Sequence, residues 1–299
     1  MTYVIENANV LADKTLTKTA FLIKQNKIAS RLTSANRLTH MRMDASSFIM
    51  TPTYVFLEHH LPENIPFQET KQFYLDRFIN KGCTVILTTT TMEYESQFHQ
   101  QMKRKRTQLN TSPIDYIVAV RIPVRLLTPS FIRKCKKEKV PAIFVEIANR
   151  DELSTVPWGW IREAMFPYNC PLIPVFNVKT SEYKQTREAW KKVIVIEKLP
   201  SVCDELKPQQ PISKCDLAKM GIYPIKANLL QGGELSYNMY MMEEPGGTHV
   251  EELDMFLYHN HRLVITVHRG NLIRVASMTQ FQSGFGEQVM VTKPSYYSI

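Results

Sequence analysis

The stretch between Thr51 and Lys198 constrains the fold of this chain most, because short apolar segments alternate there with amphipathic segments. Each pair of segments takes roughly 25 to 30 residues, the length of a βα unit. Such alternation predicts parallel strands joined by helical crossovers. The expected strands are residues 54–57, 84–88, 116–120, 142–147, 172–176 and 193–196, and the expected helices are residues 67–81, 94–108, 129–139, 160–166 and 181–191.

The number of strands bears on whether a barrel could close. Six strands are expected in this stretch, whereas a closed barrel of alternating parallel strands and helices needs eight. We therefore predict an α/β fold with a TIM-barrel-like parallel barrel that is incomplete or distorted. Missing units would leave strand edges open, and proteins rarely leave long edges uncovered. We expect a homodimer or a covering segment there, with residues 281–299 as the candidate cover.

Both ends of the chain have the pattern of β structure. Short apolar segments separated by polar turns occur at residues 3–11, 20–24 and 27–29, and again at residues 237–242, 263–268 and 271–275. The run from His268 to Asn271 is typical of a tight turn between two strands. This pattern predicts a small β-sandwich domain formed by both termini. Residues 1–50 and 215–299 would then make a composite β domain, and residues 51–214 the barrel-like α/β domain.

The composition argues against several classes of protein. The five cysteines are scattered without any C-x-x-C spacing, which speaks against a zinc finger or a disulfide framework. Glycine is scarce, and neither a P-loop nor G-x-G-x-x-G occurs, so a phosphate-binding loop of those types is not expected. The first residues lack the regions of a signal peptide, and no apolar run approaches the roughly 20 residues that cross a bilayer. We expect a cytoplasmic protein without a membrane partner.

The net charge of +9 favours acidic partners through its long-range field. The basic runs at residues 103–106 and 133–137 fall on helices expected to face water, and no aromatic residues interleave with them. Recognition of nucleic-acid bases is therefore not expected, although nonspecific binding of polyanions stays open. Thr88 to Thr91 put four hydroxyls at the carboxyl end of the second strand. Hydroxyls at that end of such a strand can bind an anionic ligand.

Several short segments, in order along the chain, carry a resemblance to a known family. They are residues 5–11, 27–29, 50–55, 81–85, 220–224, 233–235 and 267–273. In this order they resemble the amidohydrolase superfamily, whose members include dihydroorotase, allantoinase and N-acetylglucosamine-6-phosphate deacetylase. The resemblance covers nearly the whole chain. It implies a barrel with a β domain built from both chain ends, and a metal-dependent hydrolytic site at the carboxyl ends of the barrel strands.

The departures from the family pattern fall on the metal site. Glu58-His59-His60 stands where the family has His-x-His, so that only His60 aligns as a ligand. No histidine occurs between His99 and His249, although a metal needs three or four donors that converge from different strands. We therefore predict a degenerate metal site.

The resemblance also assigns the remaining site residues. Glu146 lies at the end of the fourth expected strand, where family members have a carboxylated lysine or a glutamate that binds the metal. Asn177 offers an amide at the end of the fifth. The candidate metal ligands are thus His60, Glu146 and Glu58, and the candidate catalytic residues are Glu58 and Asn177. One imidazole and two carboxylates suit at most one weakly bound divalent ion, zinc, manganese or iron, and no other cofactor is expected.

Three hypotheses for the function follow. The first is an amidohydrolase-like protein with an incomplete metal centre, a non-catalytic member that binds a small-molecule ligand or a partner. The second is an active mononuclear hydrolase of an amide or another non-peptide C–N bond: His60 and Glu146 would hold the metal, Glu58 would ligate it or act as a base, and Asn177 would orient the substrate. The third is a basic polyanion-binding protein.

Overall fold

The computed structural model describes residues 2–34, 38–242 and 251–294. The chain divides into two compact units. The first comprises Met1–Phe56, Asn64–Val85 and Pro224–Ser283, and the second comprises Leu57–Glu63, Ile86–Tyr223 and Gly284–Ile299. The domain boundaries expected near residues 50 and 214 stay a prediction.

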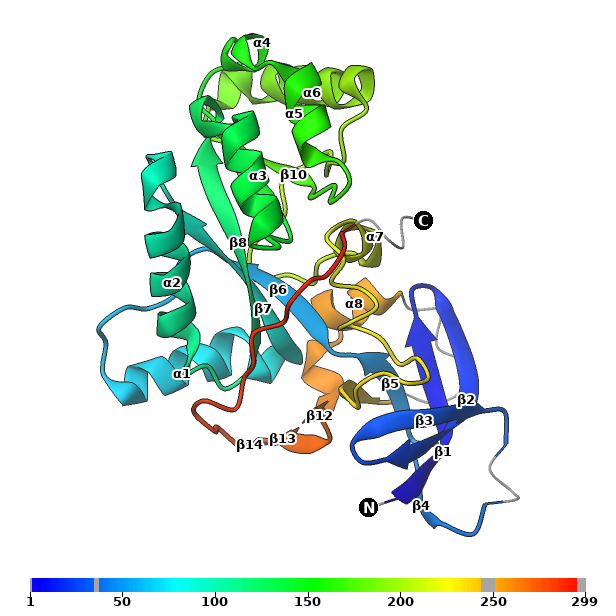
Figure 1. Cartoon of the computed structure of the whole chain (residues 1–299). Helices are drawn as coiled ribbons and strands as arrows, with labels where there is room; N and C mark the ends of the chain where they lie inside the picture. The colour runs from blue at the N-terminus through cyan, green and yellow to red at the C-terminus, as the bar shows by residue number, and fades with distance from the viewer. Residues whose placement is uncertain (1, 35–37, 243–250, 295–299) are drawn as a thin grey trace. The chain divides into compact units, whose positions relative to one another are not determined.

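The first unit is built on a nine-stranded sheet that draws on both ends of the chain. The strands follow one another in the order β14-β13-β12-β11-β5-β1-β2-β3, and β4 pairs with β1 (Figure 1). Strand β5 joins the two halves, because it pairs in parallel with β1 and antiparallel with β11. The bounds are β1 Thr2–Ala12, β2 Thr15–Lys24, β3 Lys27–Leu32, β4 Met41–Asp44, β5 Phe48–Pro52, β11 Tyr237–Met241, β12 Leu263–His268, β13 Asn271–Val275 and β14 Met278–Thr279.

The core of the first unit joins the same two ends. Its cluster of buried side chains includes Ile5, Phe21 and Met50 from the beginning of the chain, and Met239 and Val267 from the end. The helices of this unit are α1 Phe67–Arg77, η1 Ile79–Lys81, α8 Glu252–Leu257 and η4 Asn260–Arg262. The predicted β structure from both termini is therefore present as one continuous sheet.

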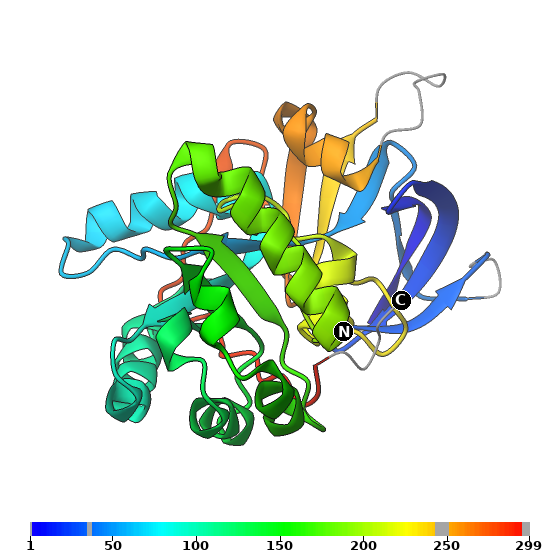
Figure 2. The same ribbon diagram turned by 90° about the horizontal axis from the view of Figure 1, so that it is seen from above.

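The second unit carries a five-stranded sheet in the order β10-β9-β8-β7-β6. Strands β8, β9 and β10 pair in parallel, and α2, α3 and α5 lie in a row along one face (Figure 2). The strands are β6 Tyr54–Glu58, β7 Cys83–Thr91, β8 Asp115–Pro123, β9 Ile143–Ile147 and β10 Leu172–Phe176; the helices are η2 Glu95–Gln97, α2 Phe98–Leu109, η3 Val124–Leu126, α3 Pro129–Lys137, α4 Glu152–Thr155, α5 Trp158–Met165, α6 Thr180–Glu197 and α7 Lys214–Lys219. The first residues of β6 and β7 belong to the first unit.

Continuous burial along the strands is typical of a parallel sheet that is covered on both faces. All five residues of β6 are buried, and so are the first eight of β7. Five parallel strands in place of the eight of a closed barrel confirm the predicted class, an α/β fold with an incomplete TIM-barrel-like sheet.

One loop covers both edges of this short sheet. After α6, Ser201 bridges to Leu172 on β10, and Pro208 bridges to Leu57 on β6. The amide of Gln209 donates a hydrogen bond to the carbonyl of Leu57 over 3.0 Å. Residues 200–209 thus take the place of the missing strands at the two outer edges, where unpaired backbone groups would otherwise be exposed.

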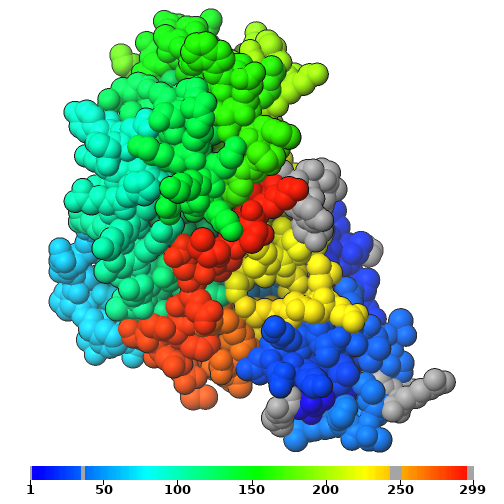
Figure 3. Space-filling view, in the orientation of Figure 1, coloured from blue at the N-terminus to red at the C-terminus, as the bar shows by residue number. Residues whose placement is uncertain are grey.

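The C-terminal segment pairs with the beginning of β8, the central strand of this sheet. Tyr116 at the beginning of β8 donates to the carbonyl of Glu287 over 3.0 Å, and Val289 donates back to Tyr116 over 2.9 Å. The segment runs along the surface, in red in Figure 3. The cover expected at residues 281–299 therefore does not lie on an outer edge: within the described residues the outer strands pair with residues 200–209, and residues 295–299 lie outside the described residues.

The sixth expected strand, residues 193–196, was a wrong prediction. These residues lie in the last part of α6, which ends at Glu197. Thr186, Trp190 and Ile194 are buried at helical spacing, whereas Val195 and Ile196 are 74% and 71% exposed. The buried face of the helix outweighs the β propensity of the apolar run.

Among the described residues, no helix combines the length and the apolar character that a membrane span requires.

Candidate ligand-binding site

The candidate site residues all lie at the carboxyl ends of strands in the second unit. Glu58 is the last residue of β6, and His60 follows two residues later. Glu146 is the penultimate residue of β9, and Asn177 comes directly after β10. In folds of this kind the carboxyl ends of the strands carry the functional site. Within the described residues, however, the ligand atoms of Glu58, His60 and Glu146 do not all come within 4.8 Å of one another.

Glu146 is held by an arginine. The Nε of Arg121 on β8 donates to Oε1 of Glu146 over 2.5 Å, and the two side chains are only 16% and 19% exposed. The register brings them together, because Arg121 pairs with Phe144 and Glu146 lies two residues further on the same face of β9. A guanidinium is permanently charged. A fixed positive charge therefore stands at the carboxylate that the family resemblance assigns to a metal.

Glu58 is buried and engaged at both oxygens. Its Oε1 accepts a hydrogen bond from the backbone amide of His60, and its Oε2 accepts one from Nε2 of Gln209, each over 3.2 Å. Gln209 belongs to the loop that covers the edge of β6. The carboxylate of Glu58 thus ties the end of β6 to this loop.

His59, which the sequence comparison passed over, is the better-placed histidine. Its Nδ1 hydrogen-bonds with the hydroxyl of Thr89 over 2.9 Å, and its ring packs edge-on against Phe144 with centroids 5.4 Å apart. Burial lowers the pKa of His59 to about 4, and the positive charges of Arg121 and Lys105 act in the same direction. The imidazole is therefore neutral at neutral pH. The alternation of the strand did not single out His59, because β6 ends one residue before it.

A cavity of about 390 Å³ opens beside His59, between the ends of β6 and β7 and the helix α2. All of its walls belong to the second unit. The lining is rich in hydroxyl, amide and basic side chains and consists of His59, His60, Leu61, Glu63, Thr89, Thr90, Thr91, Gln101, Arg104, Lys105 and Gln108. A pocket at the carboxyl ends of strands is a candidate small-molecule site, and this one is lined by far more polar side chains than the mostly apolar pockets that are usual for such ligands.

Lys105 is the unexpected member of this lining. The basic run at residues 103–106 was predicted to face water, which is wrong for Lys105, since its side chain is only 9% exposed. The signal was present in the helical spacing, because α2 buries Phe98, Met102, Lys105 and Leu109. Burial lowers the pKa of Lys105.

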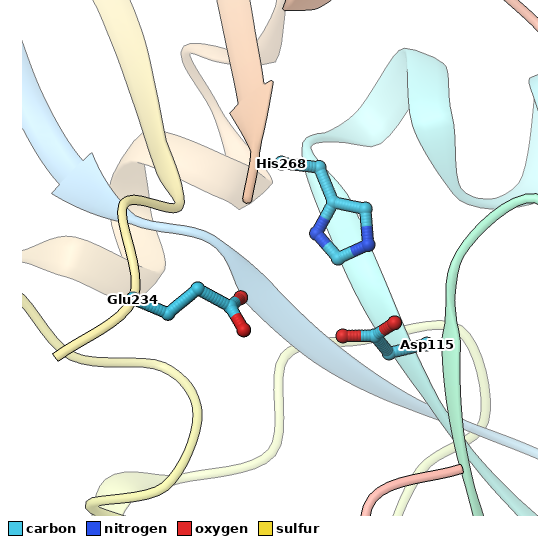
Figure 4. A group of neighbouring side chains, drawn as sticks. All are labelled: Asp115, Glu234 and His268. Carbon is cyan, nitrogen blue, oxygen red and sulfur yellow. The ribbon is translucent and has the colours of Figure 1, made fainter. Parts of the chain in front are cut away.

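A second pair of ligand-type side chains lies in the first unit. Glu234 and His268 approach within 4.8 Å (Figure 4). The carboxylate of Glu234 already pairs with Lys226 over 2.5 Å and accepts from the hydroxyl of Ser236 over 2.6 Å. Asp115, drawn in the same figure, belongs to the other unit. Two donors, one of them paired with an ammonium, fall short of a metal site.

No protein-family model matches the chain, and no curated protein matches it. Several solved structures match it. D-hydantoinase (dihydropyrimidinase) from Thermus sp. aligns with a TM-score of 0.66 at 8% identity, over 99% of this chain and 100% of that one. Dihydropyrimidinase from Brevibacillus agri aligns with a TM-score of 0.60 at 12% identity, over 98% and 99%. The chain has the fold of the hydantoinases.

A further neighbour agrees with these two. L-hydantoinase (dihydropyrimidinase) from Arthrobacter aurescens aligns with a TM-score of 0.56 at 12% identity, over 97% of this chain and 100% of that one. The resemblance to amidohydrolases seen in the sequence is thus confirmed as a resemblance of fold. At 8–12% identity the likeness concerns the fold, and function has to be argued from the site.

Proposed function

We propose that this protein is a non-catalytic relative of the metal-dependent amidohydrolases, and that it binds a small-molecule ligand at the carboxyl ends of β6 and β7. The ion pair between Arg121 and Glu146 carries the proposal. The carboxylate that the family resemblance assigns to the metal is paired with a cation of the protein itself.

The residues present do not fit a divalent metal. An ion at Glu146 would have to displace Arg121 and leave a mostly buried guanidinium without its partner, which is a costly arrangement. Both oxygens of Glu58 accept hydrogen bonds. His60 adds a single imidazole, whereas a catalytic zinc takes three protein ligands and keeps a fourth position open. The positive charges that lower the pKa of His59 would also repel a cation.

The second hypothesis, an active mononuclear hydrolase, is tested together with the first. The protein would be purified without chelator, its transition-metal content measured by plasma mass spectrometry, and its turnover of hydantoin and dihydropyrimidine substrates measured with added zinc, manganese or iron(II). We expect less than about 0.1 equivalent of metal per chain and no turnover. A stoichiometric metal that is lost in Glu146→Gln and His60→Ala, or turnover that depends on these residues, would establish the hydrolase instead.

We also propose that the protein acts in the cytoplasm, and we keep the homodimer as a proposal. Residues 200–209 pair with both outer strands of the five-stranded sheet, so these two edges do not need a second copy to cover them. Sedimentation velocity at two protein concentrations decides between a monomer and a dimer.

A further inference from the structure

Lys105 places a buried positive charge in the second unit. Its side chain is nine-tenths buried and lines the cavity beside His59. With the described residues it forms neither a hydrogen bond nor an ion pair. A buried ammonium without a partner is costly, because water that would solvate it has been removed. The cavity wall therefore carries a positive charge for which the described part of the chain provides no counter-charge in contact.

The nearby carboxylates are occupied elsewhere. Glu63 and Glu58 act on Lys105 only at longer range. Glu63 pairs with Arg104 over 2.8 Å, and Glu58 bonds to Gln209 and to the His60 amide. Since Arg104 and Glu63 cancel each other, the charge left over at the cavity wall is that of Lys105.

The remaining groups of the wall suit an oxyanion. β7 ends with the hydroxyls of Thr89, Thr90 and Thr91, and α2 adds the amide of Gln101. The hydroxyl of Thr89 is held by a hydrogen bond with the ring of His59. Hydroxyl and amide N–H groups around one ammonium provide the charge-assisted hydrogen bonds that a carboxylate or phosphate group accepts.

We propose that this cavity binds a small molecule through a carboxylate or phosphate group, with Lys105 as its counter-charge and the threonines at the end of β7 as hydrogen-bond partners. The inference rests on the proposed function and names the ligand class of that site. A volume of about 390 Å³ admits a small metabolite-sized molecule. A single unbalanced ammonium favours one anionic group.

The experiment compares four proteins: wild type, Lys105→Met, Lys105→Arg and the control Lys103→Met, which changes an exposed lysine of the same helix outside the cavity. Thermal unfolding is followed with inorganic phosphate or acetate, against chloride at equal ionic strength. An anion that binds only the folded state raises its Tm. We expect at least one of the two anions to stabilise wild type and Lys103→Met, and to bind Lys105→Met about tenfold more weakly or worse.

Lys105→Arg keeps the charge and should retain part of the effect. Stabilisation by phosphate alone indicates a phosphorylated ligand, and stabilisation by acetate alone indicates a carboxylic acid. The proposal is overturned if neither anion stabilises wild type more than chloride does, or if Lys105→Met responds as wild type does.

A second measurement uses wild-type protein and does not depend on a variant that folds. An amine-acylating reagent is applied at neutral pH, and the modified lysines are identified by peptide mass spectrometry. The stabilising anion should protect Lys105 and leave Lys103 unprotected, and equal protection of both would contradict the proposal. Metal content reports separately on the proposed function, because Lys105 is not among the candidate ligands.

Discussion

At the scale of single residues, the site is governed by where positive charge is fixed. Arg121 sits on Glu146, and Lys105 adds a second buried cation near His59. Among the described residues, Arg121 has a carboxylate partner in contact and Lys105 has none. Arg121 thus accounts for the paired carboxylate at the strand ends, and Lys105 is the cation on which the proposed anion site depends.

The ion pair should respond differently to single and double substitution. Arg121→Met leaves Glu146 as an unpaired, mostly buried carboxylate and should lower the free energy of unfolding by up to about 3 kcal/mol. The double variant Arg121→Met, Glu146→Met removes both charges and should recover most of this loss. Urea denaturation gives the three values. A single variant as stable as wild type would show that the pair is not formed.

His59 should make stability depend on pH. Its pKa is lowered to about 4 in the folded protein, against about 6.5 in an unfolded chain. Protonation therefore favours the unfolded state: the contribution is fully present above pH 6.5 and is lost as pH falls towards 4. Urea denaturation across this window should show a weaker dependence in His59→Gln than in wild type or in His99→Gln, an exposed histidine. Identical slopes in all three would refute this role.

At the scale of elements, the sequence predicts the strands better than what joins them. Strands such as β7 and β9 can be recognised as continuous apolar runs in the sequence, because both faces of the sheet are covered. The contact of Arg121 with Glu146 cannot be predicted in this way, because it depends on the register of β8 against β9. Lys105 could have been found from the spacing of the buried positions of α2. The contact of Gln209 with Glu58 could not have been found from the sequence, because the two residues are 151 positions apart and Gln209 lies in an irregular loop.

The helix that replaced the sixth expected strand gives an element-scale prediction. Trp190 is fully buried, packs on Trp158 with ring centroids 6.3 Å apart, and donates to the carbonyl of Val202. Trp190→Ala should cost about 3–5 kcal/mol. Val195→Lys, on the exposed face, should change stability by less than about 0.5 kcal/mol. If residues 193–196 formed a buried strand, Val195→Lys would be the more damaging of the two in urea denaturation.

At the scale of the whole molecule, the chain has the hydantoinase fold with a barrel-like sheet of five strands, and one loop pairs with both outer strands of that sheet. The net charge of +9 is partly balanced at the basic runs by local pairs, among them Arg104 with Glu63, Arg106 with Glu138 and Lys134 with Glu95. The overall charge is therefore less concentrated on these helices than the sequence indicates.

This balance bears on the polyanion hypothesis. Binding to a mixed-sequence DNA duplex at physiological salt should be no tighter than the nonspecific range of about 10⁻⁴–10⁻⁶ M. Fluorescence anisotropy at several salt concentrations measures it. Tight binding that falls steeply with salt and is lost when Lys103 and Arg133 are replaced by alanine would support a polyanion-binding protein.

The central claim is that a protein cation, and not a metal, neutralises Glu146 at the strand ends. A crystal structure of the protein grown with zinc and manganese, with anomalous diffraction recorded at both absorption edges, tests it most directly. We predict the guanidinium of Arg121 on Glu146 and no anomalous peak within ligand distance of Glu146, Glu58 or His60. A metal ion held by these side chains, with Arg121 turned away, would contradict the account.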